Sequence, residues 1–270
     1  MTAIKNTHHK ISKRLVTLLL VLVLVVLVSC KEDKKENNES TKTNETIEPR
    51  KIEDIMVFEN LLMEENIEDA DYNNIKFDTQ GAIFSKSKAS PTYIRIPNFE
   101  LDLNKGFNVS FWFKTDDDDG TKPQSLIAFA DKFSSASRVP FYVYFPGNRV
   151  SGVFGKQLLW AEEFNAQNGN SREYYDSFQL SKDQFYFVSV NINGSKAEIY
   201  VNSELYAYFE NLLPHDLKVN HILIGALLSN NEIANPFTGN IHGLKVFKQP
   251  LSEKEIVFLF NSQPEIIKEY

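Results

Sequence analysis

Short strand-like runs separated by turn residues constrain the fold of this chain more than any other feature. The clearest case is FYFVSVNINGSKAEIYVNSELYAYF, residues 185–209. Here Asn193-Gly194 predicts a tight hairpin turn in which both residues have positive φ. Asn202-Ser203-Glu204 predicts a second corner, where asparagine tolerates the left-handed region. The segment is therefore expected to form three consecutive antiparallel strands.

Similar runs recur along most of the chain at the spacing of a β-sandwich or barrel. They are 82–84, 93–96, 107–113, 125–129, 141–145, 150–154, 222–224 and 240–247. Helical periodicity is weak before the C-terminus, so the predicted fold class is all-β.

Alternation along two of these strands predicts which side chains face the core, because successive side chains point to opposite faces. In FNVSFWFK the apolar face consists of Phe107, Val109, Phe111 and Phe113. In FYVYF, Phe141, Val143 and Phe145 alternate with Tyr142 and Tyr144. The two tyrosines are therefore expected to stand together on the second face of their strand, where they could line a ligand groove.

One helix is clearly signalled near the C-terminus. In PLSEKEIVFLF, Ser252 and Glu255 have the spacing of a capping box, and Leu251 and Ile256 that of a hydrophobic staple. We expect this short helix to close the domain.

The N-terminal residues have the organisation of a secretion signal. Four basic residues precede an apolar run, 15–28, that is short for a membrane span. The run ends in Leu-Val-Ser-Cys, which resembles the lipobox of bacterial lipoproteins, with Cys30 as the lipidated residue. Cys30 is the single cysteine of the chain. The alternative is a short membrane anchor with an incidental cysteine.

Residues 31–50 contain one apolar residue, Ile47, and cannot bury enough surface to fold. The predicted organisation is a signal peptide over 1–29, a lipidated cysteine with a disordered tether over 30–50, and one folded domain over 51–270. The charged run 31–36 resembles export signals of Bacteroidota lipoproteins that are displayed outside the outer membrane. A plain solvated linker is the alternative.

The charge balance argues against nucleic acid as a partner. Four of the 29 Lys and Arg residues lie in 1–29, which leaves 25 against 36 acids and a net charge of −11. A nucleic-acid-binding protein needs a basic face.

Four segments, in order, resemble landmarks of the laminin-G-like, concanavalin A-like lectin/glucanase family. They are 107–114, the hairpin 185–206, ILIGA at 222–226, and 237–260 with its closing strand and capped helix. The resemblance spans most of 54–262. It implies a two-sheet antiparallel jelly-roll β-sandwich with one short C-terminal helix, in a family that contains lectins and β-glucanases.

The resemblance also raises the question of calcium, since many family members hold a structural calcium ion near the start of the domain. Asp69 and Asp71 are the candidate ligands here. The closing strand reads Ile241-His242-Gly243 where the family often has an acid after the Ile. Calcium is therefore an open alternative, and no other cofactor is expected.

Catalytic patterns are weak in this sequence. Retaining glycosidases need two carboxyl groups about 5 Å apart. Glu100 and Asp102 share a strand face, but Asn104 occupies the third position, and the adjacent Glu162 and Glu163 would point to opposite faces of a regular strand. We therefore expect a protein that is not an enzyme.

Residues 150–178 have the composition of a sugar site, where aromatic rings and polar groups converge. The candidate ligand-binding residues are Trp160, Arg172, Tyr174 and Tyr175, together with Tyr142 and Tyr144. The alternative is that these aromatic residues simply pack in the sheets.

The sequence thus predicts a lipoprotein anchored in the outer membrane by its acyl chains, palmitate among them, and exposed at the cell surface or in the periplasm. Its predicted function is non-catalytic carbohydrate binding. Two alternatives remain open, namely a surface adhesin or accessory subunit that binds a protein, and a diverged glycoside hydrolase.

Overall fold

A computed structural model describes most of one compact unit, Arg50–Tyr270. The described residues are 50–85, 90–116, 123–131, 141–146, 150–154, 157–159, 172–174, 180–182, 184–212, 219–229 and 232–262. Among them, no helix is long and apolar enough to cross a membrane.

The larger of the two main sheets has nine strands, in the order β11-β14-β13-β12-β6-β18-β4-β3, with β1 also paired to β18. The strands are β1 (Met56–Asn60), β3 (Lys76–Asp78), β4 (Gly81–Phe84), β6 (Phe107–Thr115), β11 (Arg172–Tyr174), β12 (Tyr186–Asn193), β13 (Lys196–Val201), β14 (Glu204–Phe209) and β18 (Gly239–Phe247). In the middle of this sheet β6 pairs with β18, although the two strands lie far apart in the sequence.

The second sheet has seven strands, in the order β10-β9-β8-β7-β15-β5-β2. They are β2 (Asp71–Asn73), β5 (Tyr93–Ile96), β7 (Pro123–Ala130), β8 (Phe141–Pro146), β9 (Ser151–Phe154), β10 (Gln157–Leu159) and β15 (His221–Ile224). A separate hairpin consists of β16 (Leu227–Ser229) and β17 (Glu232–Ala234). The helical elements are the 3-10 turns η1 (Ile52–Ile55) and η2 (Leu103–Lys105), and the helix α2 (Glu253–Asn261).

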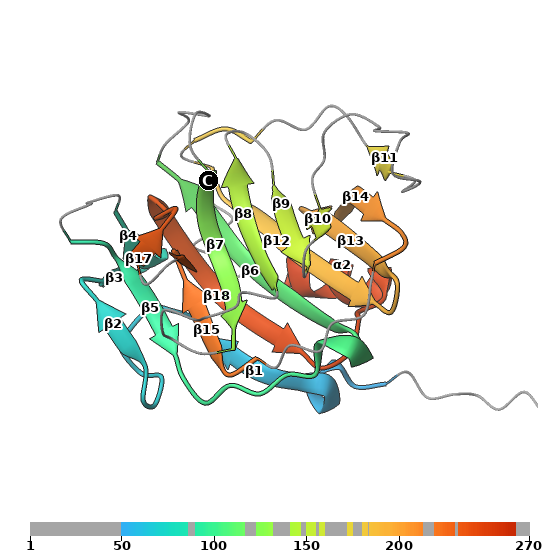
Figure 1. Cartoon of the computed structure of the whole chain (residues 1–270), viewed down its shortest axis with the longest axis horizontal. Coiled ribbons are helices and arrows are strands. Elements are labelled where there is room, and N and C mark those ends of the chain that lie inside the picture. Colours follow the sequence, from blue (N-terminus) through green and yellow to red (C-terminus); the bar gives the residue numbers. More distant parts are fainter. Residues whose placement is uncertain are drawn as a thin grey trace, which may run out of the picture. The chain divides into compact units, whose positions relative to one another are not determined.

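All strand pairs in both sheets are antiparallel, and the sheets pack face to face around one apolar core (Figure 1). The predicted inward face of β6 is confirmed, since Phe107, Val109, Phe111 and Phe113 are fully buried in that core. The seven-stranded sheet contributes Phe129, Phe141, Val143 and Phe145 from the other side. The fold is the expected two-sheet antiparallel jelly-roll β-sandwich.

The three-stranded meander is confirmed, but its first turn is centred one residue later than predicted. Asn193 pairs with Lys196, so Gly194 and Ser195 form the turn. Of these two turn residues, only Gly194 has a positive φ, which is 57°. Glycine at the first of the two positions is typical of a type II′ turn. In the second turn of the meander, both Asn202 and Ser203 adopt the left-handed conformation, with φ of 50° and 67°.

The C-terminal helix closes the second face of the nine-stranded sheet. The capping box between Ser252 and Glu255 is present as predicted. Leu251 and Ile256 are both buried in a second apolar cluster, where Trp112 stacks on Phe260 with ring centroids 5.6 Å apart. The side chains of β6 that point away from the main core are therefore buried as well.

Candidate functional site

The outer face of the seven-stranded sheet, defined as the side turned away from the main core, brings three tyrosines onto one surface. Strand alternation places them there, because their neighbours Ile94, Val143 and Phe145 point into the core. Tyr93 comes from β5, and Tyr142 and Tyr144 come from β8.

Tyr142 and Tyr144 lie side by side on this face, as the alternation of β8 predicted. Their ring centroids lie 5.5 Å apart with the planes inclined by 49°. Tyr144 is buried, whereas Tyr142 is half-buried, and this burial raises the pKa of the Tyr142 phenol. The residue opposite Tyr142 on β7 is Ala128, which belongs to a small apolar cluster against which Tyr142 packs.

Polar groups border the tyrosines on the β2–β5 side of the sheet. The Arg95 Nε lies 3.9 Å from a carboxylate oxygen of Asp71, and the Tyr93 hydroxyl lies 3.5 Å from the same oxygen. Burial, with a further contribution from the Asp71 charge, raises the pKa of Tyr93. The backbone register continues this row from Arg95 to Leu223 on β15 and to Ala128 on β7.

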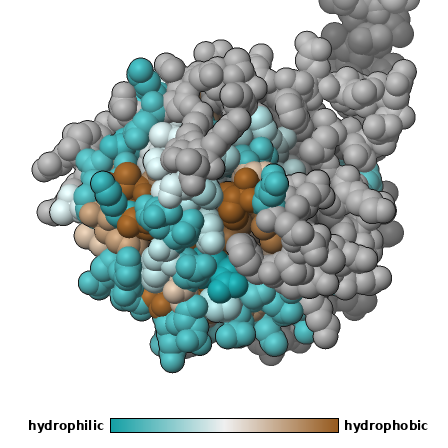
Figure 2. Space-filling model, turned by 60° about the vertical axis from the view of Figure 1, so that its left-hand side comes forward, coloured by the Kyte–Doolittle hydropathy of each residue, from teal (hydrophilic) through white to brown (hydrophobic). Residues whose placement is uncertain are grey.

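The β16–β17 hairpin covers part of this face. Leu228 and Ile233 from the hairpin pack with Leu223, Ala128 and Tyr142. Seen from the side where β2, β5 and β17 lie, small apolar patches are set among hydrophilic residues (Figure 2). The outer face thus combines aromatic, apolar and polar groups within one rigid sheet.

The buried polar atoms of this sheet that have no hydrogen-bond partner include the hydroxyl of Ser125 and the Nδ1 of His221. Ser125 lies opposite Tyr144, and His221 alternates with the core residue Ile222. Burial, and then the Arg95 charge, lower the pKa of His221. Sequence reasoning did not identify either residue as part of a site, although the alternation of β7 and β15 could have placed them on this face.

Two of the other predicted ligand residues, Arg172 and Tyr174, lie on the other sheet from the tyrosines of β8. Arg172 and Tyr174 belong to β11, an edge strand of the other sheet, where they pair with Phe209 and Ala207 of β14. Trp160, Tyr175 and Cys30 lie outside the described residues. Their assigned roles stay predictions.

The candidate calcium ligands Asp69 and Asp71 lack a described third partner. Asp71 is beside Arg95, a position that disfavours a second cation. No group of three His, Cys, Asp or Glu side chains that could hold a metal ion occurs in the described ranges. The described residues at this place do not fit a calcium site, and calcium binding there stays a prediction.

Comparison with known proteins identifies the family. A model described as the concanavalin A-like lectin/glucanases superfamily matches residues 88–257. No curated protein sequence matches the chain.

Several solved structures share the fold at low sequence identity. The binding domain of botulinum neurotoxin serotype D is 16% identical, with a TM-score of 0.56, over 78% of this chain and 53% of that one. The ligand binding domain of the same serotype in complex with N-acetylneuraminic acid is 16% identical, with a TM-score of 0.54, over 78% and 52%.

A mutant of Trypanosoma rangeli sialidase displaying trans-sialidase activity is 13% identical, with a TM-score of 0.54, over 73% of this chain and 30% of that one. The chain therefore spans about half the length of the toxin domains it matches, and less of the sialidase. The family model covers most of both sheets and the first turn of α2, and the chain belongs to the concanavalin A-like lectin/glucanases superfamily.

Proposed function

We propose that this protein is a non-catalytic glycan-binding module and that the outer face of the seven-stranded sheet carries its site. The observation that carries the proposal is the pair Tyr142 and Tyr144, held beside polar groups on one rigid sheet. Sugar sites combine an apolar aromatic surface with a few fixed polar groups. The apolar face of a pyranose would stack on Tyr142, the more exposed ring of the pair.

Polar groups on the same face supply the hydrogen bonds that a sugar needs. Arg95 and the Tyr93 hydroxyl are donors on the β5 side, and Asp71 is an acceptor.

The acid content of the sheet supports binding rather than hydrolysis. Its seven strands contain one carboxylate, Asp71, and that residue is beside Arg95. A retaining glycosidase needs two carboxyl groups about 5 Å apart. Because a sialidase is among the structural neighbours, hydrolysis remains the alternative function. If the protein bound no carbohydrate at all, a protein partner would be favoured.

The toxin domain in complex with N-acetylneuraminic acid supports carbohydrate as the ligand class. We further propose that residues 1–29 are removed as a signal peptide and that lipid on Cys30 anchors the domain to the outer membrane through the tether that precedes Arg50. The lipobox-like sequence and the composition of the tether support this placement.

Glycan-array binding of the compact unit, residues 50–270, with and without calcium, tests the function. We expect a calcium-independent glycan hit, and Tyr142→Ala should weaken it more than about tenfold, since truncating a central aromatic anchor costs about 1.4 kcal/mol or more. Tyr208→Ala is the matched control, a half-buried tyrosine on the other sheet. Loss of binding in Trp160→Ala alone would instead favour the segment 150–178.

A further inference from the structure

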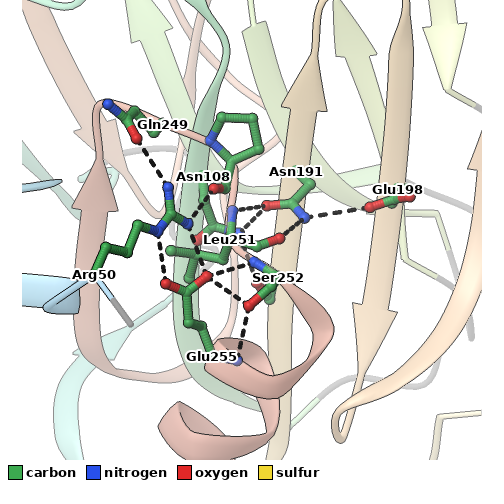
Figure 3. Close-up of polar contacts among 10 residues, drawn as sticks. Arg50, Asn108, Asn191, Glu198, Gln249, Leu251, Ser252 and Glu255 are labelled. Atoms are coloured by element: carbon green, nitrogen blue, oxygen red, sulfur yellow. Dashed lines mark hydrogen bonds and ion pairs between the residues drawn. The ribbon is translucent and has the colours of Figure 1, made fainter. Parts of the chain in front are cut away.

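Arg50 ties the start of the compact unit to the beginning of α2 (Figure 3). Its Nε and Nη2 donate to the two carboxylate oxygens of Glu255, both at 2.7 Å. Its Nη1 donates to the Gln249 side chain at 2.8 Å, and Nη2 also donates to the Pro250 carbonyl at 2.7 Å. The bidentate hydrogen bonding by Arg50 lowers the pKa of Glu255 to about 2. A flexible residue at the end of a tether would not hold four such contacts.

The same contacts continue into the centre of the nine-stranded sheet. Glu255 accepts from the backbone N–H of Ser252 at 2.6 Å. The preceding residue, Leu251, is held by Asn191 on β12, which accepts from its N–H at 2.9 Å and donates to its carbonyl at 2.7 Å (Figure 3). The point at which the chain enters the domain is therefore fixed on the α2 side of the sandwich.

The α2 side and the candidate glycan face lie on opposite sides of the sandwich. Helix α2 covers the second face of the nine-stranded sheet, where Trp112 and Phe187 point away from the main core. The tyrosines and the β16–β17 hairpin lie on the outer face of the other sheet. A chain that enters beside α2 is thus attached on the side away from Tyr142.

Helix α2 also exposes apolar side chains on the surface that it turns to solvent. Phe258 is 57% exposed and Val257 is 37% exposed, although both belong to a well-packed helix. Lys254 is exposed four residues before Phe258, so the two side chains are neighbours on the helix surface. An aromatic ring next to a lysine suits the boundary between acyl chains and lipid phosphates.

Charge does not oppose this contact with a membrane, even though the chain as a whole is acidic. Arg50 and Glu255 neutralise each other, and Glu253 and Lys254 carry opposite charges in the first turn. The helix surface therefore has no net negative charge to repel anionic lipids.

We infer that the exposed surface of α2, formed by Lys254, Val257 and Phe258, rests on the lipid bilayer, so that the glycan face points away from the membrane. The inference rests on the proposed lipid anchor at Cys30. A flexible chain of the length of 30–49, the proposed tether, has a root-mean-square end-to-end distance of about 25 Å. Such a tether keeps α2 at an effective concentration in the millimolar range, where weak apolar and electrostatic contacts with lipid add to the anchor.

The test uses the full lipidated chain in phosphatidylethanolamine–phosphatidylglycerol vesicles that carry some nitroxide-labelled headgroups. Because lipidation consumes the Cys30 thiol, a single introduced cysteine can be labelled with a fluorophore. Asn261→Cys places the label on α2, and Glu232→Cys places it on β17, and both positions are exposed. We expect the headgroup nitroxides to quench the label on α2 several-fold more strongly than the label on β17.

Phe258→Ala should reduce the quenching on α2 toward that on β17, whereas Leu61→Ala, a matched exposed apolar residue outside the helix, should leave it unchanged. Equal quenching at both labels on vesicle-bound protein would overturn the inference alone. Vesicle flotation with Cys30→Ser as control tests the anchor separately. Failure of the unsubstituted chain to float would overturn the anchor, and the inference with it.

Discussion

Replacing Asn191 by alanine should weaken the attachment of the C-terminal helix to the nine-stranded sheet. Asn191 is buried, and its side chain makes both hydrogen bonds that the structure gives to the backbone of Leu251, at 2.9 and 2.7 Å. The Asn108 amide, which donates to Asn191 at 2.8 Å, keeps Ser189 as an acceptor at 2.8 Å. The substitution therefore leaves two buried backbone groups of Leu251 without their partner.

Each buried group left unpaired costs about 1–3 kcal/mol, so Asn191→Ala should lower the free energy of unfolding by about 2–6 kcal/mol. Urea unfolding followed by fluorescence measures this loss in a Trp160→Phe background, where Trp112 is the remaining tryptophan. Trp112 stacks on Phe260, so its emission reports whether α2 is docked.

The control is Asn220→Ala, since that side chain is exposed. A loss below about 1 kcal/mol in Asn191→Ala, with unchanged Trp112 emission, would refute the reasoning. It would mean that water replaces the amide without cost, and that apolar packing alone holds α2.

Three further changes test other parts of the fold. Gly225→Ala should destabilise by about 2–5 kcal/mol in thermal unfolding, because an added Cβ would lie 2.1 Å from the Phe84 ring at a residue with φ 79°; an unchanged melting temperature would contradict this. Glu255→Gln should cost about 1 kcal/mol above pH 5, and the difference should vanish as pH falls toward 2, since the lowered pKa of Glu255 gives stability that is present above its unfolded value and lost in acid. Burial lowers the pKa of His242, so stability should fall as pH drops below about 6.5, and His242→Phe should flatten that fall in urea titrations between pH 7 and 5. An unchanged slope in that variant would show that other groups carry the acid sensitivity.

Local patterns in the sequence predicted the strands and their faces well. The alternation of β6 placed Phe107 and Phe111 in the core, and the Ser252–Glu255 spacing predicted the cap of α2. The pairing of Tyr142 with Tyr144 followed from the same two-residue period. These features depend on neighbours within a few residues, which the sequence displays directly.

Contacts between distant residues could not be predicted in this way. The register of β11 on β14, which places Arg172 on the other sheet from Tyr142, depends on pairing that three residues do not encode. Arg50 reads as part of a polar tether, yet it contacts Glu255, which is 205 residues away. Tertiary packing decides both, and each changes which residues can act together.

The crystal structure of the compact unit bound to its first glycan hit tests the central claim most directly. The account predicts a sugar ring against Tyr142 on the outer face of the seven-stranded sheet, with polar contacts to Arg95, Tyr93 or Asp71. A sugar bound on the nine-stranded sheet near β11, or in the segment 150–178 away from β8, would contradict the assignment of the site.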